Sequence, residues 1–383
     1  MKILMIAPEP FFEPRGTPFS EYYRIKGLID LGHSIDLVTY PFGEDKKIKG
    51  LQIFRCAKPP FINKVKTGPS FSKIILDIFL VIKVYGRVIK KKYDLIHTHE
   101  EANIIGTVFN KITRIPHLYD MHSSLVQQMD NFKFTKSKTI ISFFKMIEKI
   151  SLKNAKSTIV ICKSLFQYSS TITNKKKLTL IENFIDDTPK LLDKDKINDM
   201  RNKLGVQNKK VIMYTGTFEK YQGIPLVIES MKYLDENFCL VLVGGKKEQI
   251  KKIKNILKEK ALEQRVIVLG RKQPYEIPYF LKISDVLVSP RILGTNIPLK
   301  IYSYLKAGVP IVATKLYTHT QSLNENIAIL TEPEPEKFAT GIKEAVSERG
   351  KIVSNNAIEF YKQNYTYEKY LELVKIAVNK ATG

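Results

Sequence analysis

The sequence predicts an α/β protein built from two Rossmann-like domains, and three observations lead to this fold class. The chain has 383 residues, which is more than one ordinary hydrophobic core organises. Short apolar runs rich in β-branched residues alternate with longer segments of helical periodicity in both halves of the chain. A polar stretch rich in lysine and aspartate, residues 188–208, lies between the halves and is predicted to be a connector with a short helix.

The first half opens as a Rossmann-like domain does. An apolar strand is predicted at 2–7, then a loop at 8–18, a helix that ends at residue 31 and a strand at 34–40. The glycines of this opening lack the G-x-G-x-x-G spacing of a dinucleotide-binding turn. Further strands are predicted at 94–98, 117–121, 157–162 and 178–186.

Two predicted helices of the first half, 71–92 and 137–153, are both apolar and basic. In the first of them, an apolar set recurs at helical spacing: Phe71, Ile74, Ile75, Ile78, Ile82 and Ile89. Such a helix can lie in a membrane interface, but a helix that packs on a sheet also needs an apolar stripe. Both interpretations stay open, and they can hold at different faces of one helix.

The second half repeats the alternation of strands and helices. Strands are predicted at 211–215, 238–243, 266–269, 285–289, 310–313 and 327–330. Helices are predicted at 225–233, 246–264, from about residue 298 to Gly308, at 335–347 and from 355 to the end. Gly216, Gly244 and Gly245 directly follow predicted strands, where glycine lets a ligand approach the backbone closely.

The amino-acid composition limits the compartment in which the protein works and the kinds of molecule that it binds. Three widely spaced cysteines without a C-x-x-C pair argue against disulfides and fit a reducing compartment, the cytoplasm. The amino-terminal apolar run is too short for a signal peptide, and no run reaches the ~18 residues of a membrane span. The net charge of +24 fits either solvated lysine faces or attraction to anionic lipid on the inner face of a membrane. Nucleic-acid binding is disfavoured because no helix-turn-helix, zinc-finger or RRM signature is present.

The most informative stretch is 284–314, which is predicted to form a strand, a turn, a helix that starts near Pro298, a second turn and a strand. Its tail reads Gly308, Val309, Pro310, Ile311, Val312, Ala313. This stretch resembles the donor-site motif of family 4 of the retaining GT-B glycosyltransferases, also called glycosyl transferases group 1. That family usually carries two glutamates in the motif, whereas Thr295 and Ser303 stand at those positions here. The chain is therefore similar to a divergent member.

The resemblance, which spans nearly the whole chain, implies a GT-B fold whose two domains face each other across a cleft. Residues 1–187 would bind the acceptor, 188–364 would bind the nucleotide sugar, and a last helix at about 365–383 would pack back on the first domain. The implied reaction moves a sugar from a nucleotide-diphosphate donor to a hydroxyl of a glycan, glycolipid or lipid-linked acceptor, with retention. No cofactor is expected, and no metal, since the chain has no Asp-x-Asp.

In the first domain the resemblance points to the carboxyl ends of three strands. Gly16 and Thr17 lie where the family has a glycine-rich loop, although Gly16 can also be an ordinary turn glycine. His122 matches a histidine that faces the cleft and contacts the transferred sugar or moves a proton; the alternative is that it only caps the next helix. His99 and Glu100 are candidates for acceptor contact. A metal site is not expected, because the histidines do not show ligand spacing on one helix.

In the second domain the family usually grips the donor diphosphate with an arginine and a lysine. Thr217 and Gln222 occupy those two positions here, so the candidate cations are Arg271, Arg291 and Lys300. Lys300 lies in the first turn of a helix, where a lysine is unfavourable unless an anion binds; otherwise it is a solvent-facing lysine. The full set of expected donor residues is Gly216, Thr217, Gln222, Gly244, Gly245, Arg271, Asn296 and Lys300.

Two other hypotheses are kept. The altered donor motifs also suit an inactive or regulatory GT-B protein. The charge also suits a basic membrane-binding or nucleic-acid-binding module without catalysis.

Overall fold

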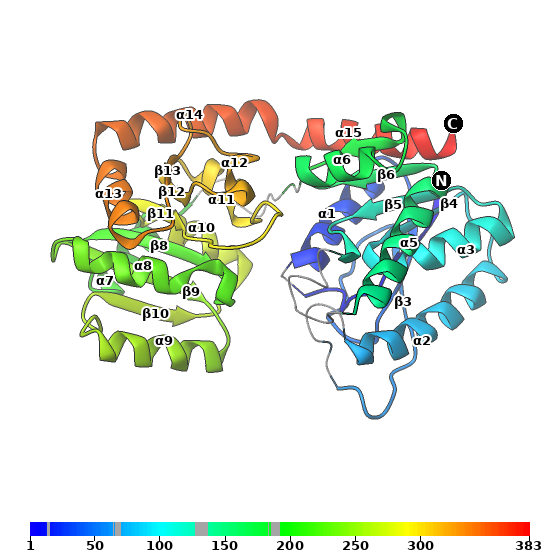
Figure 1. Cartoon of the computed structure of the whole chain (residues 1–383), viewed down its shortest axis with the longest axis horizontal. Coiled ribbons are helices and arrows are strands. Elements are labelled where there is room, and N and C mark those ends of the chain that lie inside the picture. The colour runs from blue at the N-terminus through cyan, green and yellow to red at the C-terminus, as the bar shows by residue number, and fades with distance from the viewer. Residues whose placement is uncertain (14–15, 64, 66–69, 127–136, 183, 185–191) are drawn as a thin grey trace. The chain divides into compact units, whose positions relative to one another are not determined.

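A computed structural model describes the chain except for residues 14–15, 64, 66–69, 127–136, 183 and 185–191 (Figure 1). The chain forms two compact units. Unit 1 contains Met1–Phe184 and Tyr367–Gly383, and unit 2 contains Ile185–Thr366. Each unit is built on its own parallel sheet with helices on its faces, which confirms the predicted α/β class.

Unit 1 holds a seven-stranded parallel sheet in the order β3-β2-β1-β4-β5-β6-β7. Its strands are β1 (Lys2–Ala7), β2 (Ser34–Thr39), β3 (Leu51–Arg55), β4 (Leu95–His99), β5 (His117–Met121), β6 (Ser157–Val160) and β7 (Leu178–Leu180). Every strand pair is parallel, as expected for strands that are joined by helical crossovers. The direction of strand order reverses between β1 and β4, which marks the place where ligands usually bind in such sheets.

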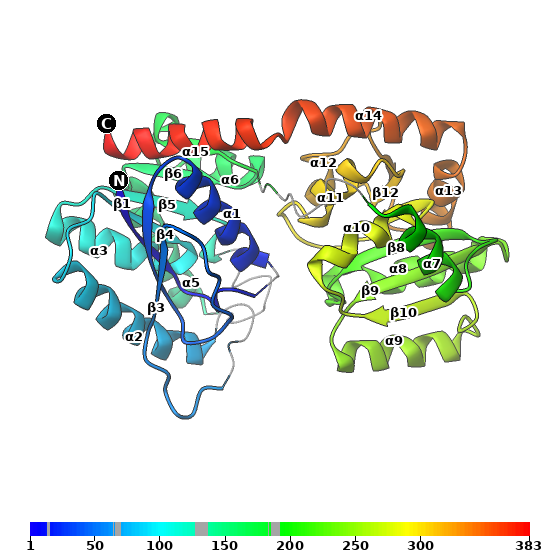
Figure 2. The ribbon, with the colours of Figure 1, turned by 180° about the vertical axis from the view of Figure 1, so that it is seen from behind.

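Helices cover both faces of this sheet (Figures 1 and 2). They are α1 (Gly16–Asp30), α2 (Phe71–Val88), α3 (Asn103–Thr113), α5 (Lys138–Asn154), α6 (Lys163–Ser170) and α15 (Tyr367–Thr382). Leu76, Leu80 and Val84 of α2 and Phe109 of α3 share a buried cluster with residues of the strands. On the other side α15, the last helix of the chain, packs on α1 and on β5, β6 and β7.

Unit 2 repeats the design with six parallel strands in the order β10-β9-β8-β11-β12-β13. They are β8 (Lys210–Gly216), β9 (Phe238–Gly244), β10 (Val266–Gly270), β11 (Val286–Ser289), β12 (Ile311–Thr314) and β13 (Ile329–Thr331). The helices are α7 (Lys194–Lys203), α8 (Ile224–Ser230), α9 (Lys247–Glu259), α10 (Ile277–Lys282), α11 (Lys300–Ala307), α12 (Tyr317–Thr320), α13 (Pro335–Ala345) and α14 (Glu348–Asn364). Strand order reverses between β8 and β11.

The structure corrects the sequence interpretation at several places. Helices α3, α6, α10 and α12 were not predicted, and the segment predicted as one helix from 355 to the end belongs to two helices, α14 and α15. Strand β3 was not predicted, because LQIFR is short and only partly buried. Helix α1 begins at Gly16, so Gly16 and Thr17 lie in its first turn and not in the expected loop. Most of the predicted apolar stripe of α2 faces solvent: Ile75 packs against the core, but Phe71, Ile74, Ile78, Ile82 and Ile89 are exposed. The stripe that is buried against the sheet is Leu76, Leu80 and Val84. No helix among the described residues has the length and hydropathy to cross a membrane.

Candidate functional site

Two glycines bring the ends of neighbouring strands together at the carboxyl edge of the unit 2 sheet. Gly216 ends β8 and Gly244 ends β9, with φ angles of 138° and 129° that favour glycine. A Cβ atom on Gly244 would lie 1.8 Å from the carbonyl oxygen of Gly216, which no side chain tolerates. The two strand ends are therefore held in close backbone contact, next to the point where strand order reverses.

The side chain of Lys300 lies against this pair of strand ends. Its Nζ atom is 3.4 Å from Oε1 of Gln222 and 3.6 Å from the centre of the Tyr214 ring. A Cβ atom on Gly216 would meet Nζ at 3.2 Å, so the lysine packs on bare backbone. The alternative of a solvent-facing lysine does not hold, because the side chain is partly buried.

The positive charge of Lys300 is not balanced by a negative side chain of the described residues. Burial, and then the nearby charge of Arg291, hold the pKa of Lys300 well below its usual value. Within the described part of the chain, no carboxylate lies at ion-pair distance from Lys300. A bound anion would supply the missing counter-charge and would raise that pKa.

Arg291, which follows β11, is the second cation of this group. Its Nη1 donates to the carbonyl oxygen of Asn296 at 2.7 Å and to Oγ1 of Thr318 at 3.0 Å. The guanidinium lies 4.9 Å from the centre of the Tyr221 ring, and burial lowers the pKa of Arg291. Nε of Arg291 has no hydrogen-bond partner among the described residues. We name the two cations, Lys300 and Arg291, together with Gln222, which contacts Lys300, the cation group.

The other predicted donor residues lie at the same carboxyl edge, at different distances from the cation group. The backbone carbonyl of Thr217 accepts the Tyr214 hydroxyl at 2.7 Å, while its side chain is exposed. Gly245 has a φ of 78°, and a Cβ there would meet the Phe218 ring at 2.3 Å. Arg271 is exposed after β10, the edge strand, two strands away from β8. Donor roles for these residues remain predictions.

Unit 1 gathers a second set of polar side chains at the carboxyl ends of β4 and β5. His99 ends β4 and His122 follows β5; Nδ1 of His99 and Nε2 of His122 lie 3.1 Å apart. Asp120 places Oδ1 3.4 Å from Nε2 of His122, and its Oδ2 accepts a hydrogen bond of 2.7 Å from Nε of Arg24. All four side chains are buried. The structure thus brings together His99 and His122 and adds Asp120 and Arg24, which the sequence did not reveal.

Among the charged contacts of this buried group, the ion pair between Arg24 and Asp120 has the largest influence on the charge of Asp120. Burial alone would raise the pKa of Asp120, but the charge of Arg24 and contacts with His122 and His97 hold it well below its usual value. Burial lowers the pKa of His122 to about 4, against the opposing attraction of Asp120. His122 is therefore neutral at pH 7, with a ring that can accept a proton or a hydrogen bond.

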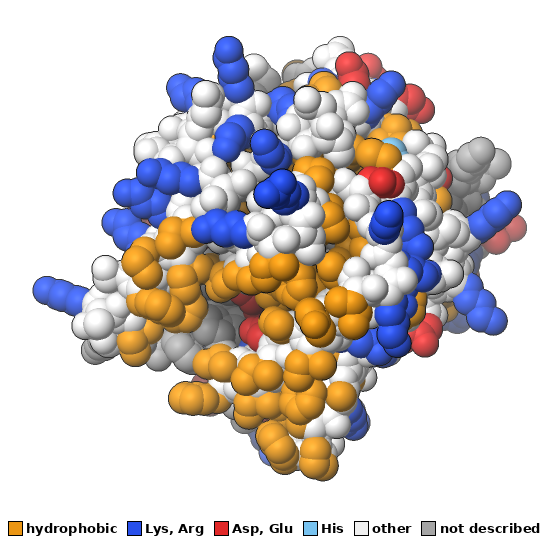
Figure 3. Space-filling model, turned by 90° about the vertical axis from the view of Figure 1, so that its right-hand side faces the viewer, with side chains coloured by type: hydrophobic (Ala, Val, Ile, Leu, Met, Phe, Trp, Pro, Cys, Tyr) orange, Lys and Arg blue, Asp and Glu red, His pale blue; other side chains and the backbone are white. Residues whose placement is uncertain are grey.

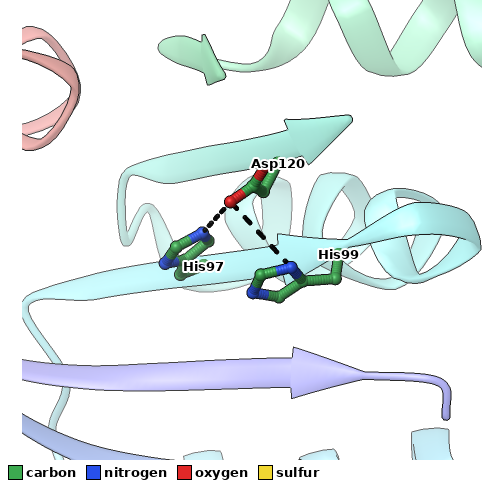
Figure 4. Close-up of side chains that lie close together, drawn as sticks. All are labelled: His97, His99 and Asp120. Carbon is green, nitrogen blue, oxygen red and sulfur yellow. Dashed lines mark ion pairs between the residues drawn. The ribbon is translucent and has the colours of Figure 1, made fainter. Parts of the chain in front are cut away.

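Asp120, His97 and His99 also have the geometry of a metal-ligand set (Figure 4). One potential ligand atom from each lies within 4.8 Å of the others. Ligand spacing along one helix does not indicate this set, because its members come from two adjacent parallel strands. The guanidinium of Arg24 already provides the positive charge beside Asp120 and would repel a metal cation. The ion pair with Arg24 therefore disfavours a metal ion between these three side chains.

The remaining predicted residues of unit 1 lie at the same edge or near it. The Glu100 carboxylate accepts a hydrogen bond of 2.9 Å from the Ser123 hydroxyl, and burial raises the pKa of Glu100 well above its usual value. Glu100 has a φ of 47°, an uncommon backbone conformation that is found at functional turns. Gly16 has a φ of 52° and open space where a Cβ would be. Acceptor contact by Gly16, Thr17, His99 and Glu100 remains a prediction.

One of the missed residues had a signal in the sequence. Asp120 and His122 are two residues apart at the end of a strand, and alternate residues of a strand point to the same face. Arg24 had no comparable signal, because its pairing spans 96 residues of sequence.

Comparison with known proteins defines the class. The family model described as "Glycosyl transferases group 1" matches residues 196–364, and the one described as "Glycosyltransferase Family 4" matches residues 22–188. Together with two parallel α/β units, these matches define a GT-B glycosyltransferase fold. The chain belongs to the glycosyl transferases group 1, family 4, as the sequence motif predicted.

Curated relatives resemble the chain at modest identity. UDP-Gal:alpha-D-GlcNAc-diphosphoundecaprenol alpha-1,3-galactosyltransferase of Escherichia coli is 27% identical over 63% of this chain. The chain spans 63% of that relative's length. Alpha-monoglucosyldiacylglycerol synthase of Acholeplasma laidlawii is 24% identical over 75% of this chain and 73% of its own.

Solved structures share the fold over the full length. The Anabaena protein HepE in complex with UDP and glucose superposes with a TM-score of 0.78 at 18% identity and covers 99% of both chains. Sucrose-phosphate synthase from Thermosynechococcus elongatus has the same TM-score and identity, over 99% of this chain and 98% of its own.

Proposed function

We propose that this protein transfers a sugar from a nucleotide-diphosphate donor to a hydroxyl group of a glycan, glycolipid or lipid-linked acceptor. Family membership supports sugar transfer. Two relatives, the Escherichia coli galactosyltransferase and the Acholeplasma laidlawii glycolipid synthase, have names that include a lipid-linked or lipid molecule. HepE has been solved with UDP and with UDP-glucose, which makes uridine nucleotides the first donors to test.

The observation that carries the donor assignment is the cation group of unit 2. Lys300 and Arg291 are partly buried, and burial lowers the pKa of both. A leaving diphosphate needs positive charge beside it, because negative charge accumulates on it as the sugar departs. We propose that Lys300 and Arg291 supply that charge, that no metal ion is needed, and that Gly216 and Gly244 let the diphosphate approach the backbone.

For unit 1 we propose that His122 contacts the transferred sugar or the acceptor hydroxyl as a neutral ring. Asp120 lies 3.4 Å from the ring and Arg24 fixes Asp120, so the orientation of His122 is set by a buried network. His99 and Glu100 complete the proposed acceptor edge. Transfer with retention is part of the proposal, by resemblance to the family.

The altered donor positions favour one second candidate, an inactive or regulatory GT-B protein. Thr217 and Gln222 replace the usual cations, and Thr295 and Ser303 replace the usual glutamates. Gln222 contacts Lys300, which suggests that Lys300 takes over the role of the missing lysine. We therefore favour the enzyme. The three buried free cysteines fit a reducing compartment, and we propose a cytoplasmic protein.

Calorimetry with UDP, UDP-glucose, UDP-galactose and GDP-mannose tests the donor assignment, and release of free sugar from each nucleotide sugar tests catalysis. The enzyme should bind at least one of these donors and slowly hydrolyse it without an acceptor. Binding without any turnover would favour the regulatory candidate. If none of the four ligands binds, the proposed donor site is wrong.

A further inference from the structure

Helix α2 carries two apolar stripes, and only one of them is used by the fold. Leu76, Leu80 and Val84 are fully buried against the sheet of unit 1. The second stripe faces solvent, although one apolar stripe is all that a helix on a sheet requires. Its members are Phe71, Ile74, Ile78, Val81, Ile82, Tyr85 and, directly after the helix, Ile89, and they are 39–80% exposed.

The two neighbouring helices extend this exposed apolar area. Helix α3 shares the buried cluster of α2, and α5 packs on α3. Exposed apolar side chains on these helices are Val108 and Ile112 of α3 and Ile140, Phe143, Met146 and Ile150 of α5. Figure 3 views this side of unit 1 and shows hydrophobic side chains gathered in one area with lysines and arginines around it. We name these side chains, with those of the second α2 stripe, the apolar face.

The charge around the apolar face is almost entirely positive, because the acidic side chains of the three helices turn inward. They carry two carboxylates, Asp77 and Glu148. Tyr40 donates to Asp77 at 2.6 Å, and Ser124 and the backbone N–H of Leu125 donate to Glu148 at 3.0 and 2.7 Å. The exposed cations are Lys90, Lys92, Lys111, Arg114, Lys138, Lys145, Lys149 and Lys153.

A hollow on the apolar face combines the same two properties. It has a volume of about 410 Å³ and lies between β3 and α2. Apolar groups form most of its wall, from Phe54, Ala57, Phe79 and Ile82. Lys83 and Lys90 line the rest together with Arg87, which is already paired with Asp36 at 2.6 Å. An apolar wall beside cations suits an amphiphile with an anionic head.

We propose that the apolar face docks this protein on a bilayer that contains anionic lipid, and that the acceptor is carried in the same bilayer. A helix with exposed Phe and Ile on one side and lysines beside them fits the boundary between headgroups and acyl chains. Each lysine near an anionic surface adds attraction. The part of the proposal that concerns the acceptor rests on the proposed function.

A second copy of the chain is a poorer occupant of the apolar face. The chain carries a net charge of +24, so two copies meeting through their lysine-rich sides would repel each other. Lysine is also depleted in protein–protein interfaces.

One ion pair connects the apolar face to the proposed acceptor edge. Nζ of Lys73, in the first turn of α2, lies 2.7 Å from Oε1 of Glu101. Glu101 follows His99 and Glu100 at the end of β4. The amino-terminal end of α2, where Phe71 is 80% exposed, is thereby fixed beside the strand end that carries these residues. A bilayer docked on the apolar face would therefore bring its surface, and an acceptor carried in it, close to that strand end.

Flotation of the full chain with phosphatidylcholine vesicles, with and without phosphatidylglycerol, tests the docking. Wild type should float with the anionic vesicles at low salt and be released in 1 M salt, where the screening length is about 3 Å. The variant Ile78→Ser/Ile82→Ser/Ile89→Ser should raise the lipid concentration for half-binding at least about tenfold. Lys90→Gln/Lys92→Gln/Lys149→Gln should do the same, since three attractive charges are lost.

Two control variants of unit 2 test whether the loss of vesicle binding is specific to the apolar face and the lysines around it. Lys252→Gln/Lys254→Gln/Lys258→Gln removes the same charge from α9 of unit 2, and Tyr233→Ser/Ile352→Ser removes exposed apolar groups from that unit. Both should bind vesicles like wild type. The docking proposal is overturned if wild type does not float with anionic vesicles, or if the α9 variant loses as much binding as the Lys90/Lys92/Lys149 variant. It is also overturned if wild type is a dimer that the isoleucine variant converts to a monomer.

Binding of UDP in solution, without vesicles, separates this proposal from the donor assignment. The isoleucine variant should bind UDP like wild type, because its substitutions lie on unit 1 and on exposed positions. Vesicle docking without UDP binding would leave the apolar face intact and reject only the donor site.

Discussion

The ammonium group of Lys300 lies 3.6 Å from the centre of the Tyr214 ring. An aromatic face attracts a cation without neutralising it, so the ring can hold Lys300 in place while its charge stays available. The neighbouring Arg291 adds a second positive charge and makes the place more favourable for an anion. The first two predictions follow from this relationship.

Replacement of Lys300 by alanine should weaken binding of UDP by about 1.5–3 kcal/mol, the usual contribution of a hydrogen bond to a charged group. Calorimetry measures the affinity. Lys306→Ala is the matched control, because it removes the same charge from the same helix. Equal small losses in both variants would mean that Lys300 acts only through net charge.

Binding of UDP should be accompanied by uptake of protons. Burial and Arg291 hold the pKa of Lys300 well below its usual value in the free protein, and a bound diphosphate would raise it. Between the two pKa values the complex therefore holds more protons than the free protein. Calorimetry in buffers of different ionisation enthalpy measures this uptake, which should be smaller in Lys300→Met. An uptake that is unchanged in this variant would assign the protons to another group.

Replacement of His122 by alanine should lower turnover at least about tenfold, the lower range for loss of a positioned side chain at a reacting centre. UDP binding should stay close to wild type, because His122 belongs to unit 1 and the cation group to unit 2. Turnover and donor affinity are measured separately. Unchanged turnover would make His122 a structural residue.

The variant Asp120→Asn should lower the free energy of unfolding by about 3–5 kcal/mol, because it leaves the buried charge of Arg24 without a partner. Urea unfolding measures the loss. Asp199→Asn breaks an exposed ion pair with Lys203 and should cost only about 0–1 kcal/mol. In wild type, Asp120 has a lowered pKa, so its contribution to stability is present above the unfolded pKa of about 3.9 and is lost as pH falls through the folded value. Similar losses in both variants would contradict the buried-pair interpretation.

The variant Gly244→Ala should weaken UDP binding, because its Cβ would collide with the Gly216 carbonyl and move the strand end on which Lys300 packs. Gly205→Ala is the control: that glycine also has a positive φ, 66°, but nothing lies within 4 Å of its Cβ position. Both variants carry backbone strain, and only Gly244→Ala adds a clash. If UDP affinity is the same in both, close contact of these strand ends is not required.

The strands and the fold class were predictable because apolar runs and their spacing are local properties of the sequence. Strand β5, residues 117–121, was predicted with its observed bounds. Lys300 could be placed in the first turn of a helix because Pro298 and Gly308 mark the ends of that helix in the sequence.

The rest of the fold and of the candidate site depends on contacts between residues far apart in the sequence, and a single sequence does not reveal such contacts. The ion pair of Arg24 with Asp120 requires the packing of α1 on the sheet to be known. For α2, periodicity revealed an apolar stripe but not that Leu76 and Leu80 form the buried one while Ile78 and Ile82 face solvent. A helix with two apolar stripes has two orientations that satisfy the same pattern, and only packing selects between them.

The return of α15 to unit 1 fixes the order in which the protein can be completed during synthesis. The hydroxyl of Tyr370 accepts a hydrogen bond from Nη1 of Arg24 across 346 residues of sequence, and its ring stacks on Phe184. Unit 2 is contained in one continuous segment and can close as soon as it has left the ribosome. Unit 1 begins first and closes last, since its helical cover over β5, β6 and β7 emerges only after the whole of unit 2. Until then Arg24 lacks its hydrogen bond to Tyr370, so a nascent chain that stalls before residue 367 leaves the proposed acceptor edge without the cover of α15.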